Sequence, residues 1–304
     1  MNVIVTGGAG FIGSNIALEL DKKHKVTVID SLFSGYLNNL KGFNGRFINL
    51  DVTDEKVCNI ENKADVIIHQ AAITDPRYEN DHETFQKNVK GFKNILKLAK
   101  KSNAKVIYAS TANLYGNGPF PMSEDQDVKI ISVYGKSKLE IEKIAATLHT
   151  KMHIVGLRYF NVYGPRESGK GRPASMIYHL WKQMRQDRKP RLFKFGEQKR
   201  DQIYVKDVVT ANLLAMNAPS GVYNVGTGKA VSFNEIVRVL NDLLGTQLDI
   251  EYIDCPYNEE TYQNNTQANT AKAEKYLGFK AKYSFRQGVK NYHDFLVRQE
   301  DVHG

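Results

Sequence analysis

Apolar residues in the first half of the chain follow two patterns that alternate along the sequence. Short apolar runs rich in β-branched residues are typical of buried parallel strands, and they occupy 2–6, 25–29, 46–50, 65–69, 104–109 and 152–158. Segments with the spacing of amphipathic helices lie between them, at 11–22, 54–61, 79–101 and 133–149. This alternation predicts an α/β fold with a Rossmann-type, doubly wound parallel sheet.

The pattern changes after Pro165, where a glycine-rich, charged loop begins. The remaining pattern predicts helices at 174–187, 205–217, 232–244 and 270–277, strands at 191–195, 222–225 and 248–253, and a polar loop at 254–269. We therefore expect a first domain over 1–164, which also receives segment 202–226, and a smaller C-terminal α/β domain over 165–304.

Composition and charge narrow the class of protein. A hydrophobic share of 41% and a charged share of 25% are those of an ordinary globular protein, and no apolar run approaches the roughly 20 residues of a membrane span. The predicted strand directly after Met1 leaves no room for a signal peptide. Two distant cysteines, Cys58 and Cys255, fit a cytoplasmic protein without disulfides. Because the net charge of +9 is spread along the chain, we expect neither a nucleic acid nor a membrane as partner, and the histidines show no metal-ligand spacing.

A glycine-rich turn joins the first predicted strand to the first predicted helix. Gly7, Gly10 and Gly13 follow the spacing G-x-x-G-x-x-G. A helix start offers unpaired N–H groups and the positive end of its dipole to a pyrophosphate, and glycine lets the phosphates approach closely. The next strand ends at Asp30, whose carboxylate can bind a ribose hydroxyl pair. Since 31–36 contains no Arg or Lys for a 2′-phosphate, we expect NAD rather than NADP.

A second motif, Y-x-x-x-K, runs from Tyr134 to Lys138 at the start of a predicted helix. The two residues are one helical turn apart and so share a face. A phenol with a pKa of about 10 is scarcely ionised at neutral pH, and a nearby ammonium should lower that pKa. Tyr134 can then exchange a proton with a substrate hydroxyl that Thr111, at the end of a central strand, also hydrogen-bonds.

With these motifs the chain resembles the extended short-chain dehydrogenase/reductases, and among them the nucleotide-sugar epimerases and dehydratases. The resemblance runs along nearly the whole chain; further matching segments are 69–72, 88–91, 110–116, 158–165 and 200–208. It implies NAD as cofactor and a nucleotide-diphosphate sugar as substrate. The cofactor-binding residues that it implies are Gly7, Gly10, Phe11, Ile12, Gly13, Asp30, Ser31, Ser34, Gly35, Asp51, Val52, Ala71, Ala72, Asn88, Tyr134, Lys138, Tyr159 and Val162.

The same resemblance implies the catalytic and substrate-binding residues. Thr111, Tyr134 and Lys138 would be the catalytic triad, and the substrate would also meet Asn161, Lys170, Arg200 and Thr266. Arg200 would bind the diphosphate, for which a guanidinium is suited; the alternative is a surface arginine paired with Asp201. His69 ends an apolar strand, and we interpret it as a core residue.

The resemblance also implies a homodimer in which helices 84–101 and 133–149 of two copies form a four-helix bundle. Apolar residues of the first of these helices would serve partly in that interface: Phe85, Phe92, Ile95, Leu96 and Ala99.

The type of reaction follows from what stands beside Thr111. Related dehydratases carry an Asp-Glu pair there, whereas this chain has Ala112-Asn113-Leu114, so elimination of water is disfavoured. A transient oxidation that ends in epimerisation fits better. Segments 30–40 and 116–132 look like the UDP-hexose 4-epimerases. Segments 158–180 and 262–268 look more like ADP-heptose 6-epimerase, in which a lysine matching Lys170 can act as a second base. The alternative, which the sequence alone favours, is that Lys170 is a solvated loop lysine.

The loop over 254–263 departs from both subfamilies, because Asn258 to Thr261 offers acids where many members carry a phosphate-binding arginine. Thr266 is small where some 4-epimerases have a bulky aromatic residue, which leaves room for an N-acetyl group. We favour a 4-epimerase of UDP-glucose/UDP-galactose or of the N-acetylated pair UDP-GlcNAc/UDP-GalNAc. ADP-L-glycero-D-manno-heptose 6-epimerase is the alternative. A third reading, an NAD-sensing binding protein without turnover, is disfavoured by the complete triad.

Overall fold

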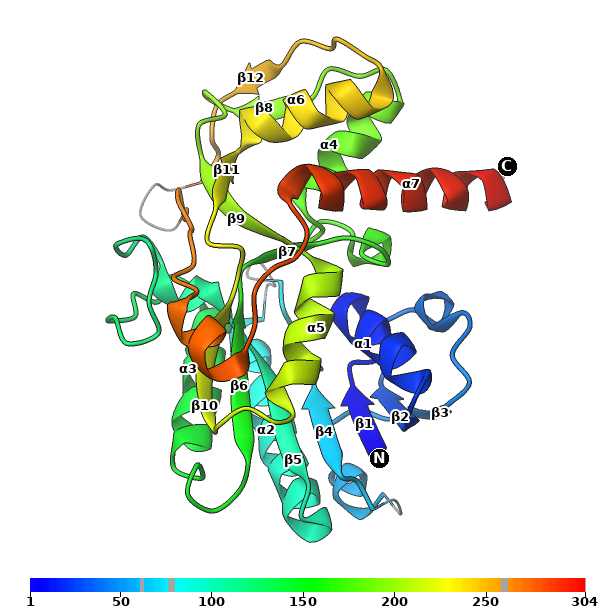
Figure 1. Cartoon of the computed structure of the whole chain (residues 1–304), viewed down its shortest axis with the longest axis vertical. Helices are drawn as coiled ribbons and strands as arrows, with labels where there is room; N and C mark the ends of the chain where they lie inside the picture. Colours follow the sequence, from blue (N-terminus) through cyan, green and yellow to red (C-terminus); the bar gives the residue numbers. More distant parts are fainter. Residues whose placement is uncertain (61–62, 76–79, 258–261, 304) are drawn as a thin grey trace.

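A seven-stranded parallel sheet forms the larger part of the molecule in this computed structural model, which describes residues 1–60, 63–75, 80–257 and 262–303. The strand order is β10-β6-β5-β4-β1-β2-β3. Their bounds are β1 (Asn2–Thr6), β2 (Lys25–Asp30), β3 (Arg46–Asn49), β4 (Val66–His69), β5 (Lys105–Thr111), β6 (Ile154–Tyr159) and β10 (Gly221–Val225). All of them run toward the second, smaller part of the molecule (Figure 1). The predicted Rossmann-type sheet is confirmed.

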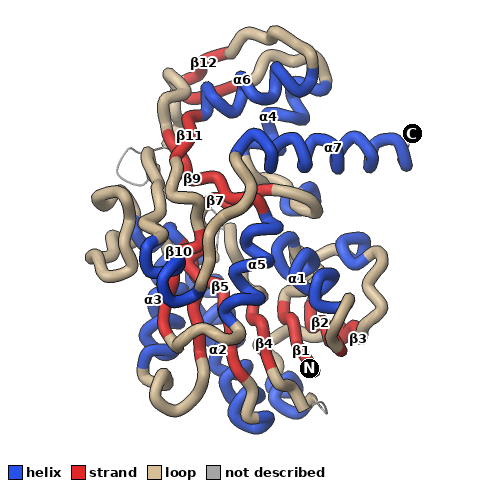
Figure 2. Tube along the Cα trace, viewed as in Figure 1, coloured by secondary structure: helices blue, strands red, loops and turns tan. Residues whose placement is uncertain are grey.

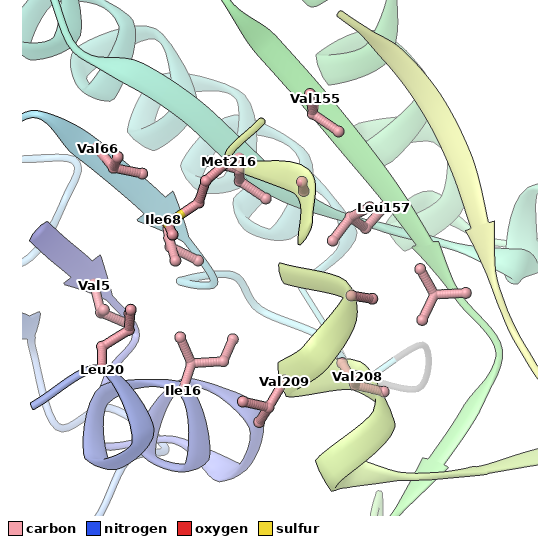
Figure 3. Packing of buried hydrophobic residues seen from close by; sticks show 14 of the residues in the cluster. Val5, Ile16, Leu20, Val66, Ile68, Val155, Leu157, Val208, Val209 and Met216 are labelled. Carbon is pink, nitrogen blue, oxygen red and sulfur yellow. The ribbon is translucent and has the colours of Figure 1, made fainter. Parts of the chain in front are cut away.

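Helices cover both faces of this sheet (Figure 2). They are α1 (Phe11–Asp21) and α5 (Val205–Ala215) on one face and α2 (Asp81–Ser102) and α3 (Val133–Ala146) on the other. Successive side chains of a strand point to opposite faces. Val3 and Val5 therefore join the cluster under α1 and α5, while Ile4 joins the cluster under α2 and α3. Figure 3 shows the first of these clusters, with Ile16 of α1 and Val209 of α5 packed between the helices and β1.

The smaller part contains two short sheets and three helices. The order in its three-stranded sheet is β11-β9-β7, and β8 pairs with β12. The bounds are β7 (Asn161–Tyr163), α4 (Met176–Arg185), β8 (Arg191–Phe193), β9 (Lys199–Tyr204), β11 (Ala230–Ser232), α6 (Phe233–Leu244), β12 (Glu251–Ile253) and α7 (Phe285–His303). Its core includes Leu180, Trp181, Leu240 and Tyr292. Short 3₁₀ helices span Leu37–Leu40, Glu55–Asn59, Ala112–Tyr115 and Ser168–Lys170, and a π-helical turn spans Ala273–Leu277.

Among the strands and α-helices of the described residues, the sequence did not predict four. Three are the short strands β7, β9 and β11, and β9 begins with the polar run Lys199 to Gln202, which no hydropathy pattern identifies as a strand. The fourth is α7, in which Val289, Tyr292 and Leu296 are buried at helical spacing among many charged residues. The predicted helix at 54–61 is a 3₁₀ helix instead, because its buried residues are only Val57 and Cys58.

The apolar residues of α2 belong to the core of their own chain. Phe92, Ile95 and Ala99 are fully buried under the large sheet. The exposed side of α2 carries lysines instead, at 90, 93, 97 and 100. Phe92, Ile95 and Ala99 are therefore core residues, whereas Phe85 and Leu96 are only partly buried. The homodimer stays a prediction. No helix among the described residues is long and apolar enough to cross a membrane.

Candidate functional site

The glycine-rich turn between β1 and α1 is built as an anion cradle. Gly7 has φ +65°, a backbone conformation that glycine adopts readily. A methyl group on Gly13 would overlap the carbonyl oxygen of Gly7, and one on Gly7 would lie 2.6 Å from the Ala71 nitrogen. The first turn of α1 itself contains no acidic residue, so its N–H groups and positive dipole end can face an anion. This cradle fits the pyrophosphate of a dinucleotide.

Asp30 stands at the end of β2, beside the cradle. Its buried carboxylate accepts hydrogen bonds from the backbone N–H groups of Ala9 (2.9 Å) and Leu32 (2.8 Å). Burial raises the pKa of Asp30, and these backbone bonds oppose the rise. A methyl group on Gly35 would lie 2.8 Å from the same carboxylate. The adjoining loop holds Ser31 and Ser34 at the surface. The structure thus brings the expected ribose-binding residues to the rim of the cradle.

Further predicted cofactor residues lie on α2 and in the segments after the neighbouring strands. Asn88 of α2 is buried; its amide donates to the Ile73 carbonyl and the Ser137 hydroxyl, both at 3.0 Å, and accepts from the Ile73 N–H at 2.8 Å. It therefore ties the segment of Ala71 and Ala72 to α3. Asp51 accepts from the Thr53 N–H at 2.8 Å, and the Val52 side chain lies 2.7 Å from where a methyl group on Gly91 would stand.

The three predicted catalytic residues come together where β5 ends and α3 begins. Ser132 caps α3 by accepting from the Gly135 N–H at 3.0 Å, which fixes the turn that carries Tyr134. The Thr111 side chain hydrogen-bonds the Tyr134 phenol. The Lys138 Nζ lies 5.8 Å from the centre of the Tyr134 ring and donates to the Ala109 carbonyl at 2.8 Å.

The direction of the Tyr134 pKa differs from the sequence-based expectation. Burial raises the pKa of Tyr134 to about 12, and the hydrogen bond from Thr111 opposes the rise. Burial also lowers the pKa of Lys138 to about 8, against the charge of Glu142. The expected lowering of the Tyr134 pKa is therefore wrong for this arrangement, because desolvation of the phenol dominates.

The Lys138 pKa of about 8 predicts that kcat falls as pH rises through that value, because the ammonium beside Tyr134 is then lost. A pH profile of kcat measures this. Lys136→Met, which removes an exposed lysine of the same helical turn, should leave the profile in place. A profile that stays level to pH 10 would contradict the prediction.

Lys170 reaches the cofactor cradle from the smaller part of the molecule. It ends the 3₁₀ helix Ser168–Lys170, and its Nζ lies 5.6 Å from the centre of the Phe11 ring, at the first residue of α1. Burial lowers the pKa of Lys170, while the charges of Glu167 and Asp75 raise it. A basic group thus faces the cradle from the side of the loop that follows β7.

Arg200 of β9 is a buried cation. It is 7% exposed, its Nη1 donates to the carbonyls of Asn264 (2.6 Å) and Lys199 (3.0 Å), and it lies 5.4 Å from the centre of the Tyr262 ring. No carboxylate of the described residues forms a salt bridge with it. The pairing with Asp201 is absent, since Asp201 accepts from Thr227, Gly228 and Ala268. A buried guanidinium without a counter-charge is costly, so this position suits an anionic ligand.

The same end of the sheet carries four further predicted site residues: Asn161, Thr266, Tyr159 and Val162. The Thr266 hydroxyl lies 3.1 Å from the Asn161 side-chain oxygen, to which it donates, and accepts from the Asp201 N–H at 3.1 Å. Its single hydrogen is thus already donated, while Asn161 remains exposed. The Tyr159 hydroxyl is also occupied, by Asn212 at 2.8 Å, so Tyr159 offers its ring, and Val162 is partly buried beside it on β7. The acids of 258–261 lie outside the described residues.

The family of this chain is identified by its similarity to known proteins. Residues 3–226 match the NAD dependent epimerase/dehydratase family. The chain belongs to this family.

The similarity to characterised members extends over nearly the whole chain. The chain is 36% identical to the ADP-L-glycero-D-manno-heptose-6-epimerase of Brachyspira hyodysenteriae, over 97% of its own length and 98% of that protein. It is 34% identical to a putative UDP-glucose 4-epimerase of Methanocaldococcus jannaschii, over 95% and 96%. The crystal structure of the Helicobacter pylori ADP-L-glycero-D-manno-heptose-6-epimerase superposes with a TM-score of 0.92 at 37% identity, covering 97% and 96%. The protein is thus an NAD-dependent nucleotide-sugar epimerase.

A buried ion pair lies behind the predicted catalytic residues of the epimerase, and sequence reasoning missed it. Arg158 of β6 donates to both carboxylate oxygens of Glu142 on α3, at 2.9 and 2.7 Å, and the Ser110 hydroxyl donates to the same carboxylate at 2.5 Å. Burial lowers the pKa of Arg158, but Glu142 more than offsets this and the net pKa is raised. The i, i+4 spacing of Tyr134, Lys138 and Glu142 could have identified the acid as part of the same helix face.

His69 is a neutral core residue, as interpreted from the sequence. Its Nδ1 lies 2.7 Å from the Thr6 hydroxyl, and its ring packs against Phe92 with centroids 5.8 Å apart. Burial, together with the charge of Lys138, lowers the pKa of His69 to about 3. The described residues contain no cluster of side chains that could hold a metal ion.

Replacement of Gly13 by alanine should weaken NAD binding by the epimerase about tenfold to a hundredfold. The added methyl group collides with the Gly7 carbonyl, and such overpacking costs about 1–3 kcal/mol. Calorimetric titration with NAD measures the effect. Gly245→Ala is the control: its methyl group meets nothing within 4 Å, but its φ of +65° is strained for alanine, so it should lower stability and leave NAD affinity unchanged.

Proposed function

We propose that this epimerase inverts carbon 6 of an ADP-heptose, as ADP-L-glycero-D-manno-heptose 6-epimerase. The observation that carries the proposal is the position of Lys170, whose Nζ lies 5.6 Å from the Phe11 ring centre at the cofactor cradle. The heptose epimerases among the relatives, at 36% and 37% identity, support the same choice. The preference for a UDP-hexose that the sequence alone suggested therefore gives way to its alternative.

A second proton-transfer group suits an exocyclic carbon. When an exocyclic carbonyl turns its other face by rotation about the bond to the ring, its oxygen moves away from the first acid. A second acid must then stand where the oxygen arrives. Tyr134 lies on α3 and Lys170 lies on the loop after β7. The reaction requires two such proton-transfer groups, one for each position of the oxygen.

The residues have the following roles in this proposal. Residues 1–164 with 202–226 hold NAD through the glycine turn and Asp30, and 165–304 hold the substrate through Arg200. When bound, NAD supplies the acceptor and then the donor of the hydride. Tyr134 exchanges the proton of the sugar hydroxyl, Thr111 hydrogen-bonds the same oxygen, and the Lys138 ammonium stabilises negative charge on the phenol. Lys170 protonates or deprotonates the oxygen in its second position.

A UDP-hexose 4-epimerase is the second candidate. The 34% identical relative from Methanocaldococcus jannaschii and the small side chain of Thr266 favour it. It accounts for the site less well, because it leaves Lys170 without a role.

The test is incubation with ADP-D-glycero-D-manno-heptose, UDP-glucose and UDP-N-acetylglucosamine in separate reactions, with the products identified by proton NMR. We expect conversion of the heptose alone, and a loss of about 10²-fold or more in Lys170→Met. Conversion of a UDP-sugar alone would establish the second candidate. A 4-keto-6-deoxy product would indicate a dehydratase, and bound NAD without any conversion would indicate an NAD-sensing protein.

A further inference from the structure

The loop 164–175, between β7 and α4, carries a buried carboxylate that the reaction proposed above does not use. Glu167 is 0% exposed. Its carboxylate accepts hydrogen bonds from the Gly164 N–H (3.2 Å) and from the N–H and hydroxyl of Ser175 (both 2.8 Å). Because these donors stand at the two ends of the loop, Glu167 closes the loop at its base.

The closed loop determines where Lys170 lies. The Lys170 N–H donates to the Glu167 carbonyl at 2.9 Å, which forms the 3₁₀ turn that presents the lysine. On the outer side, Arg166 fastens the loop to the cofactor part of the molecule, donating to the Asn39 carbonyl at 3.0 Å and the Asn15 side chain at 3.2 Å. The path of the backbone up to Lys170 is therefore fixed from both sides.

Charge links the two residues as well. The Lys170 ammonium lowers the pKa of Glu167, which burial raises. The Glu167 carboxylate in turn raises the pKa of Lys170, as does Asp75 from the segment after β4, while burial lowers it. The other titratable groups that feel the Glu167 charge are the phenols of Tyr163 on β7 and Tyr292 on α7, and that charge raises the pKa of each. Lys170 is thus the cation that compensates Glu167.

We propose that Glu167 is a positioning residue for the epimerisation: it holds the Lys170 loop against α1 and supplies the negative charge that the half-buried ammonium requires. This inference rests on the role of Lys170 in the proposed function. Glu167 itself is fully buried at the base of the loop that it closes. It therefore acts through Lys170.

The test compares Glu167→Gln, Ser175→Ala and Lys170→Met by the pH dependence of kcat, by bound NAD and by thermal unfolding. The assay uses whichever of the three nucleotide sugars above the unmodified protein converts. Glu167→Gln should lower kcat at least tenfold with NAD content unchanged. One part of the pH profile of kcat should report the ionisation of Lys170, and we call it the Lys170-dependent limb. Glu167→Gln should also move this limb to lower pH, because a negative charge near the ammonium is removed. Ser175→Ala keeps that charge and loses only hydrogen bonds, so it should lower the melting temperature without moving the limb.

A double variant separates positioning from general destabilisation. If Glu167 acts through Lys170, Glu167→Gln should not slow the Lys170→Met protein any further. An equal slowing in both backgrounds, or a lower melting temperature with an unmoved limb, would make Glu167 a structural residue only and overturn the inference while leaving the role of Lys170 intact. Unchanged kcat in Lys170→Met would instead overturn that role and the inference together.

Glu167→Asp covers the case in which Glu167→Gln does not fold. It keeps the charge and shortens the reach to Gly164 and Ser175, so kcat should fall while the limb stays in place. Unchanged kcat in this variant would overturn the inference.

Discussion

Replacement of Tyr134 by phenylalanine should lower kcat about 10²- to 10⁴-fold, the range that general acid–base catalysis contributes, while NAD stays bound. The change removes one oxygen, the only atom of this ring that exchanges a proton. The ring itself stays beside Lys138, whose Nζ is held by the Ala109 carbonyl at 2.8 Å. The Thr111 hydroxyl keeps its place at the end of β5, so the substrate still meets one of its two hydrogen-bond partners.

Three measurements check this prediction: turnover by NMR, NAD content by absorbance of the cofactor released on denaturation, and the melting temperature. Tyr276→Phe makes the same chemical change at a tyrosine that is 47% exposed, and it should leave all three unchanged. If Tyr134→Phe kept more than a tenth of the activity, another group would have to carry the proton.

The predicted site residues that the structure brings together depend on local spacing. The glycine turn is set by the seven residues from Gly7 to Gly13, and a helix places Tyr134 beside Lys138 whatever packs around it. Asp30 and Thr111 were found because parallel strands end at a common edge. For such residues, position in the sequence nearly determines position in the site.

What the sequence did not predict depends on contacts between distant segments. The burial of Arg200 is completed by the Asn264 carbonyl, 64 residues away, and that of Glu167 by the packing of α7. The pKa of Tyr134 moved in the opposite direction from the expectation because desolvation is a property of the assembled site and cannot be read from its neighbours along the helix. The short polar strand β9 was missed for the same reason, since its buried polar side chains find their partners only in the folded chain.

Removal of one partner of the Arg158–Glu142 pair should have the largest effect on stability. Glu142→Ala leaves a guanidinium that is 6% exposed without its carboxylate, and breaking a buried pair in this way costs about 3–5 kcal/mol. It also deprives the Ser110 hydroxyl of its acceptor. Urea denaturation of the NAD-loaded protein measures the loss in the free energy of unfolding.

The matched control is Glu251→Ala, which breaks an Arg–Glu pair at the surface. Arg191 and Glu251 are 57% and 49% exposed at 3.4 Å, and such pairs contribute less than about 1 kcal/mol. The double variant Glu142→Leu/Arg158→Met decides what the buried pair does. If the penalty of the single variant comes from an uncompensated charge, replacing both partners should restore most of the lost stability. Kcat should remain low in the double variant even then, because Lys138 has lost the carboxylate that raises its pKa. Equal effects of Glu142→Ala and Glu251→Ala would contradict this account, since burial would then make no difference to the pair.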